Sequence, residues 1–157
     1  MTGLASLALF ASATAVSPDA AAEELRDHFL RFCISAAVAE IPAIASEYRW
    51  VEVAPTGEEN LPRIFTPEGK DFPTLVLVPT RQSDASSLTC TVYDPAIERE
   101  DLVAAASQAL GDFRQKADSD NIAWMTPDGR TVVGRNIRVS TFESERKVFA
   151  LSVRKTL

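Results

Sequence analysis

Hydrophobic residues at helical spacing mark the first element of the folded chain. The apolar stripe consists of Leu25, Phe29, Phe32, Cys33 and Ala36. Ser17 and Asp19 are residue types that cap a helix start, and Pro18 between them suits a first turn. The pattern therefore predicts a long helix from about residue 18 and a shorter one over residues 42–48, which a proline starts.

Apolar runs and alternating patterns after residue 49 predict strands. We expect strands over residues 50–53, 74–79 and 88–93, and a brief extended run over 63–66. In the strand over 88–93, Leu88, Cys90 and Val92 share one face, and Thr89, Thr91 and Tyr93 take the other. Polar residues over 55–62 and 82–87 and a turn over 67–70 separate these strands.

A second amphipathic helix is predicted after Asp94-Pro95, over residues 96–111 or beyond, with Gly111 either ending it or lying inside it. Its expected buried side consists of Leu102, Ala106, Leu110 and Phe113. A polar loop over 112–121 leads to strands over 122–125, 130–142 and 147–153, with a turn at 127–129. The inward residues expected in the two long strands are Val133, Ile137, Val139, Phe149, Leu151 and Val153. This parity places Arg135 inward, near the end of its strand, and Arg138 outward.

The predicted order of elements is α-α-β-β-β-α-β-β-β. Strands joined by short turns form antiparallel sheets, and helices then collect on one face. We therefore expect an α+β fold, a two-layer sandwich of a mostly antiparallel sheet with its helices on one side.

The N-terminal residues have the pattern of an export signal. Residues 4–15 are small and apolar, carry no charge, and end in two overlapping A-x-A patterns. The run is too short to span a membrane, which takes about 20 apolar residues. Residues 1–3 lack the usual Lys or Arg, and the alternative is a buried N-terminal helix of a cytosolic protein. We predict a signal peptide over 1–15, one globular domain over 16–157, a periplasmic or secreted location, and no stable membrane anchor after cleavage.

Charge and cysteine content narrow the function classes. The chain of 157 residues has a net charge of −6, which argues against nucleic-acid binding. Residues 130–157 nevertheless carry 7 basic and 2 acidic side chains. Cys33 and Cys90 are the only cysteines; in an exported chain this even number favours a disulfide, the alternative being two buried thiols. Their predicted helix and strand faces point to the same core, which supports the bridge.

No residue pattern indicates catalysis, a metal or a cofactor. His28 is the only histidine, and no G-x-S-x-G accompanies it, so a partly exposed helix histidine is expected. Glu58-Glu59 in a loop and the carboxylates Glu98, Glu100 and Asp101 at a helix start imply no glycosidase-like pair. Two cysteines without neighbouring histidines make a poor zinc site, and the six scattered glycines form no phosphate-binding loop.

Aromatic and basic residues are the candidates for binding a partner. Large aromatics and arginines dominate protein interfaces, although a tryptophan at a strand edge is also common in cores. The candidate partner-binding residues are Trp50, Trp124, Arg138, Arg146, Lys147 and Arg154.

Several of these features together resemble a known group of sequences. Phe29-x-x-Phe32-Cys33 in a helix, Trp50 opening a strand, Cys90-x-Val92 in another strand and the Leu-containing helix that follows are similar to a group of small exported proteins of proteobacteria. The resemblance covers about residues 25–113. It implies a periplasmic location and a bridge of the same type, and it supplies no catalytic residues.

The sequence thus favours a small periplasmic binding or interaction protein without catalysis, of the inhibitor or immunity type, whose partner is another periplasmic protein. The alternative is a periplasmic hydrolase that works with carboxylates. A pocket that gathers Glu58, Glu59 or Glu98 with Trp50 would favour the enzyme.

Overall fold

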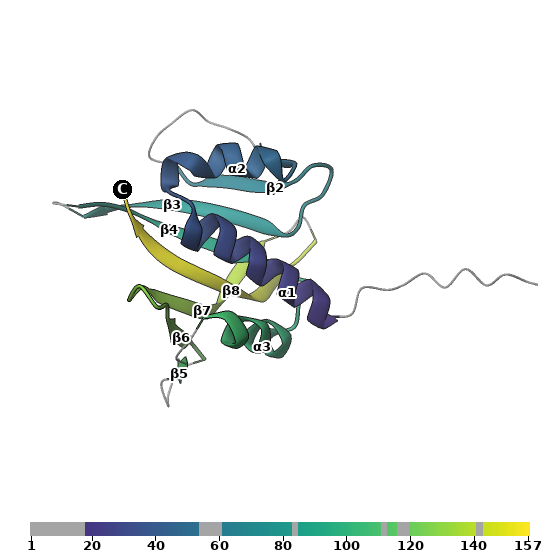
Figure 1. The fold of residues 1–157 in the computed structure, drawn as a ribbon. Coiled ribbons are helices and arrows are strands. Elements are labelled where there is room, and N and C mark those ends of the chain that lie inside the picture. The colour runs from purple at the N-terminus through teal and green to yellow at the C-terminus, as the bar shows by residue number, and fades with distance from the viewer. Residues whose placement is uncertain (1–17, 54–60, 83–84, 111–112, 116–119, 141–142) are drawn as a thin grey trace, which may run out of the picture.

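A computed structural model describes residues 18–53, 61–82, 85–110, 113–115, 120–140 and 143–157. The predicted signal peptide over 1–15 and the pair Glu58-Glu59 lie outside these residues. Within them the protein has an α+β fold, with helices packed against one antiparallel sheet, as the sequence predicts (Figure 1).

The helices follow the apolar stripes expected from the sequence, with one difference in position. They are α1 (Pro18–Phe29), which continues as a π-helical turn over Leu30–Ser35; a 3₁₀ turn over Val38–Glu40; α2 (Ile41–Glu47); and α3 (Arg99–Ala109). The difference concerns α3, which begins three residues later than predicted. Asp94 forms a turn instead of a cap, because its side chain accepts a hydrogen bond from the Ala96 amide and its carbonyl accepts one from the Ile97 amide.

The strands form one sheet of eight members in the order β1-β2-β3-β4-β8-β7-β6-β5, and every neighbouring pair is antiparallel. They are β1 (Trp50–Val53), β2 (Arg63–Pro67), β3 (Thr74–Gln82), β4 (Ala85–Tyr93), β5 (Phe113–Gln115), β6 (Ile122–Met125), β7 (Thr131–Ser140) and β8 (Glu145–Thr156). The described residues form four strands before α3 and four after it, where the predicted order has three in each place. β2 is a full member of the sheet, and β5 lies in the segment predicted as a loop. β3 and β4 also extend into the predicted turn over 82–87, up to residues 83–84.

The chain is built from two halves of similar topology. Each half is a helical segment followed by a meander of four strands, and the last strand of one half, β4, pairs with the last strand of the other, β8. The helices α1 and α3 pack against each other, and α1 also packs on β4 and α3 on β8 (Figure 1). The two halves therefore share one helical layer and one core.

The core lies between the helices and one face of the sheet. Strand side chains on this face alternate with those on the opposite, helix-free face. As predicted, Phe149, Leu151 and Val153 of β8 face the core, as do Leu88, Cys90 and Val92 of β4; all six are at most 5% exposed.

The parity predicted for β7 is wrong. Val132 and Gly134 face the core, whereas Val133, Ile137 and Val139 are only half-buried and belong to the helix-free face. Arg135 shares their face and is exposed, so it does not point inward.

Gly134 explains why the pattern is misleading. A Cβ atom at this position would lie 2.5 Å from Cζ of Phe149 and 2.9 Å from Cζ3 of Trp124. Two large aromatic side chains from β8 and β6 thus fill the place where a β7 side chain would stand. The core face of β7 therefore lacks a large residue, and the valines on its other face produce the stronger hydrophobic pattern.

A disulfide joins the helical layer to the sheet. Cys33 and Cys90 are bonded, their Cα atoms are 5.5 Å apart, and both residues are fully buried. The structure thus confirms the predicted bridge and the predicted packing of the first helix on the strand that carries Cys90.

Reducing this disulfide should lower the free energy of unfolding by about 4 kcal/mol, because the bridge closes a loop of 57 residues in the unfolded chain. Urea denaturation with and without dithiothreitol measures the change. The double variant Cys33→Ala/Cys90→Ala is the control and should unfold at the same low urea concentration under both conditions. Superimposable curves for the oxidised and reduced natural chain would contradict the expectation.

Candidate functional site

The helix-free face of the sheet exposes a group of apolar side chains on β1, β2 and β3. Val51, Val53, Ile64 and Val78 are 36% to 46% exposed. The strand register places Val53 opposite Ile64, and Ile64 opposite Val76, which is half-buried. Because opposite residues in paired strands share a face, these side chains form one continuous patch. We call these five residues the valine patch.

The centre of the same face is lined with small polar residues. Thr91 of β4 and Ser152 of β8 stand opposite each other, and their hydroxyl oxygens are 2.8 Å apart in a buried hydrogen bond. Thr89, two residues from Thr91, stands opposite Arg154. The centre of the face therefore carries short polar side chains, and two of them are hydrogen-bonded to each other.

The charges on this face are all of one sign in the described part of the chain. Arg135 of β7 and Arg146 and Arg154 of β8 share the parity of the helix-free face, and all three are exposed. No Asp or Glu occupies a position of that parity in the described strands. A chain with a net charge of −6 thus presents a face on which the described positions of β1–β4 and β6–β8 include three exposed arginines and no carboxylate.

The structure places both candidate tryptophans in the core. Trp50 is 5% exposed and Trp124 is 1% exposed. The Trp124 indole N–H donates a hydrogen bond to the Ser107 hydroxyl of α3, at 3.1 Å. This is the core alternative that the sequence left open.

The four basic candidates fall into separate places. Arg138 and Lys147 stand opposite each other near the end of the β7–β8 hairpin, on the side of the sheet that carries the helices. Arg138 forms an exposed ion pair with Glu145, at 3.4 Å. Arg146 and Arg154 lie on the helix-free face, about 26 Å apart along β8 at about 3.3 Å per residue. The structure therefore brings Arg146 and Arg154 onto one face and leaves the other two off it.

Sequence reasoning missed the valine patch and Arg135. For Arg135 the signal was the alternation of Val133, Arg135, Ile137 and Val139, but that pattern fits either face of a sheet. Only the pairing of the strands decides which side the helices cover.

His28, near the end of α1, lies in a small hollow along one side of this helix. The hollow measures about 310 Å³ and is lined by Ala20, Glu23, Glu24, Asp27, His28, Arg31 and Tyr48. The imidazole packs against the rings of Phe32 and Trp50, whose centroids are 5.9 and 5.0 Å away. Its Nε2 is 3.6 Å from the Glu24 carboxylate. Burial lowers the pKa of His28 below 6.5, and the nearby carboxylates of Glu24 and Asp27 oppose this effect.

Three carboxylates lie in this hollow, whereas Glu58 and Glu59, which the hydrolase alternative names, lie outside the described residues. Its acidic members are consecutive-turn neighbours on one helix, and neither Glu98 nor Trp50 lines it. Among the described residues no cluster of three or more metal-binding side chains occurs.

No family model matches the chain, and no match was found among curated proteins or among solved structures. Among the described helices, none is long and apolar enough to cross a membrane.

His28 should make stability depend on pH between about 7 and 5. Because its pKa is lower in the folded protein than in the unfolded chain, the unfolded chain binds the proton first as the pH falls. The free energy of unfolding should therefore fall below pH 6.5 and level off below the folded-state pKa. Urea denaturation of the natural chain and of His28→Gln at pH 7.5, 6.5, 5.5 and 5.0 provides the test. The stability difference between the two proteins should change over this range, and a constant difference would refute the assignment.

Proposed function

We propose that this chain is a small exported, non-catalytic interaction protein that binds an acidic protein partner through the helix-free face of its sheet. One observation carries the proposal: this face combines the valine patch with Arg135, Arg146 and Arg154 and has no carboxylate among its described positions. Exposed apolar groups of this kind are typical of interaction sites. Arginines on the same face as the valine patch favour a partner of opposite charge.

The shape of the face suits a protein partner better than a small substrate. Stable protein interfaces bury about 800 Å² on each side, and the exposed residues of this face are spread from β1 to β7. At its centre Thr91 and Ser152 are buried and bond to each other. An inhibitor or immunity-type role fits such a face, and it is preferred to the hydrolase alternative.

Export is the second part of the proposal. The apolar run over residues 4–15, the disulfide between Cys33 and Cys90, and the resemblance of residues 25–113 to exported proteins all support a periplasmic or secreted location. Disulfides persist in oxidising compartments and are rare in the cytosol. The partner would then be a periplasmic protein with an acidic surface.

Photo-crosslinking in the source cells tests the binding face. A benzoylphenylalanine at Val78, which lies in the valine patch, should give a crosslinked product, whereas the same residue at the exposed Ala104 of α3 should not. Reversing two charges, Arg135→Glu with Arg154→Glu, should reduce the crosslink at least tenfold through repulsion of the acidic partner. The matched control, Lys70→Glu with Lys147→Glu, changes the net charge equally but away from this face, and should leave the yield unchanged. Equal loss in both pairs, or equal crosslinking at Ala104, would contradict the proposal.

Intact mass tests export. Protein recovered from the periplasm should begin near Val16, and its two cysteines should react with an alkylating agent only after reduction. A full-length mass with both thiols freely alkylated would show a cytosolic protein.

A further inference from the structure

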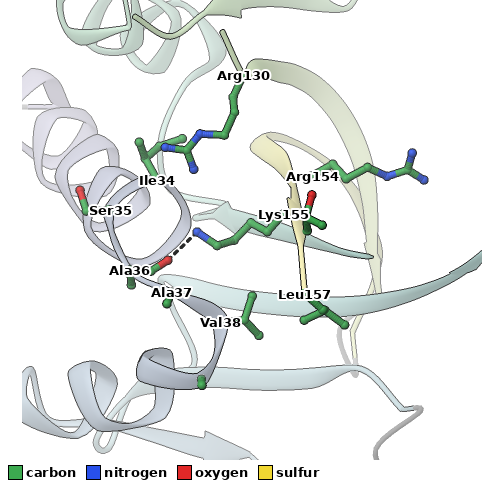
Figure 2. Close-up of a pocket in the computed structure, with 11 residues that line it drawn as sticks. Ile34, Ser35, Ala36, Ala37, Val38, Arg130, Arg154, Lys155 and Leu157 are labelled. Carbon is green, nitrogen blue, oxygen red and sulfur yellow. Dashed lines mark hydrogen bonds between the residues drawn. The ribbon is translucent and has the colours of Figure 1, made fainter. Parts of the chain in front are cut away.

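A second candidate site lies where the helical layer meets the end of β8. An open groove of about 770 Å³ runs between the end of the first helical segment and the end of β8. Its lining consists of Ile34, Ser35, Ala36, Ala37, Val38, Ala39, Arg130, Arg154, Lys155, Thr156 and Leu157. Figure 2 shows Lys155 and Arg130 reaching toward the helical segment, whereas the side chain of Arg154 points away from it.

Lys155 forms the base of this groove. It continues the core-facing positions of β8 and is 7% exposed. Its ammonium group donates a hydrogen bond to the carbonyl of Cys33 at 2.8 Å and another to the carbonyl of Ala36 at 2.6 Å; Figure 2 shows the second. An ammonium has three N–H donors, so one donor is left for a ligand. In the described part of the chain, no carboxylate forms an ion pair with Lys155.

Arg130 supplies a second positive charge at the rim. Its Nε and one terminal nitrogen contact Asp128 Oδ2, at 2.8 and 2.7 Å. The second terminal nitrogen is not used in this pair. Asp128 is exposed and bonds to Thr126 and Arg130, and these bonds lower its pKa to about 2, so it is ionised at neutral pH.

The balance of charge in the groove is positive. The lining contains basic side chains and no Asp or Glu. Asp128 beside the groove offsets the charge of Arg130, whereas Lys155 has no carboxylate partner among the described residues. The carbonyls of Cys33 and Ala36, which form the negative end of the helical segment, are already bonded to Lys155. Burial lowers the pKa of Lys155, and the positive charge of Arg130 lowers it further, whereas Asp128 opposes both effects. A ligand carrying negative charge would compensate this excess.

Apart from Ser35 and Thr156, the rest of the lining is apolar. Ile34 and Val38 are half-buried and pack against the core, and Leu157 is 61% exposed on the opposite side. Apolar walls with a few placed polar groups are the usual make-up of ligand pockets, whose volumes run from about 300 to 1,000 Å³. The groove thus offers a surface for a hydrocarbon chain and cations for its head.

We propose that this groove binds a carboxylate attached to an apolar chain, with Arg130 and Lys155 holding the carboxylate and Ile34, Val38 and Leu157 covering the chain. A fatty acid and the C-terminal end of an apolar peptide share this chemistry. The site goes beyond the proposed interaction face. Arg154 borders both sites, but its side chain points away from the helical segment, and the residues proposed to hold the ligand are not those of the interaction face, so each proposal can fail without the other.

Amide chemical shifts of the oxidised protein test the site with defined probes. Decanoate, decanol, acetate and acetyl-Ala-Val-Leu with a free carboxyl end are each titrated at pH 7.5. We expect saturable shifts at residues 34–39 and 155–157 with decanoate, with the peptide, or with both, and this comparison identifies the source of the carboxylate. Decanol and acetate should bind at least tenfold more weakly, because each lacks one half of the ligand.

Two variants separate binding from folding. Arg130→Gln should weaken binding of the carboxylate probe at least tenfold, and Ala37→Trp should abolish binding by filling the groove from an exposed position. Arg138→Gln removes the same charge outside the groove and should bind as the natural chain does. Dispersed spectra show that each variant is folded. Absence of saturable shifts, shifts centred on the valine patch, or equal affinity of Arg130→Gln and the natural chain would overturn the proposal.

Discussion

Cys33 is fixed to two strands, and the rest of the fold depends on this constraint. Its side chain is bonded to Cys90 on β4, and its carbonyl accepts a hydrogen bond from Lys155 on β8. These two strands are the ones that join the halves of the sheet. One turn of helix thus bridges the junction, covalently on one side and by a charged hydrogen bond on the other. Burying the ammonium costs free energy, which its bonds to two carbonyls at the negative helix end offset.

In both halves of the molecule a helix covers one face of a four-stranded meander. Each meander of four strands has one apolar face, and a helix that packs on its last strand covers that face. The amino-acid sequences of the halves show no repeat. The topology recurs because an antiparallel meander with a single apolar face needs a cover, whatever residues provide the contact.

Sequence patterns predicted the parts of this fold in which one face carries all the apolar residues. The first helix and β4 come close to this, and β8 has its largest apolar residues on one face; the bridge between Cys33 and Cys90 followed from the parities of the first helix and β4. β7 failed because Gly134 leaves its core face to Phe149 and Trp124. The exposed basic residues could be named from the sequence, but which face each occupies depends on strand pairing. Lys155 was missed because a lysine near a strand end reads as a solvated charge, and its acceptors lie about 120 positions away in the chain.

The pairing of β4 with β8 also bears on when the chain can fold. Partners in this pair, such as Ser87 and Thr156, lie about 70 positions apart, and such distant pairing makes folding slow. The sheet stays in two separate pieces until β8 is present, because β8 pairs with both β4 and β7. Lys155 lies on β8, so its charged bond to the first helical segment and the central strand pair form together. Before β8 is present the chain has no complete core, which is the state in which a polypeptide can still be threaded through a narrow channel.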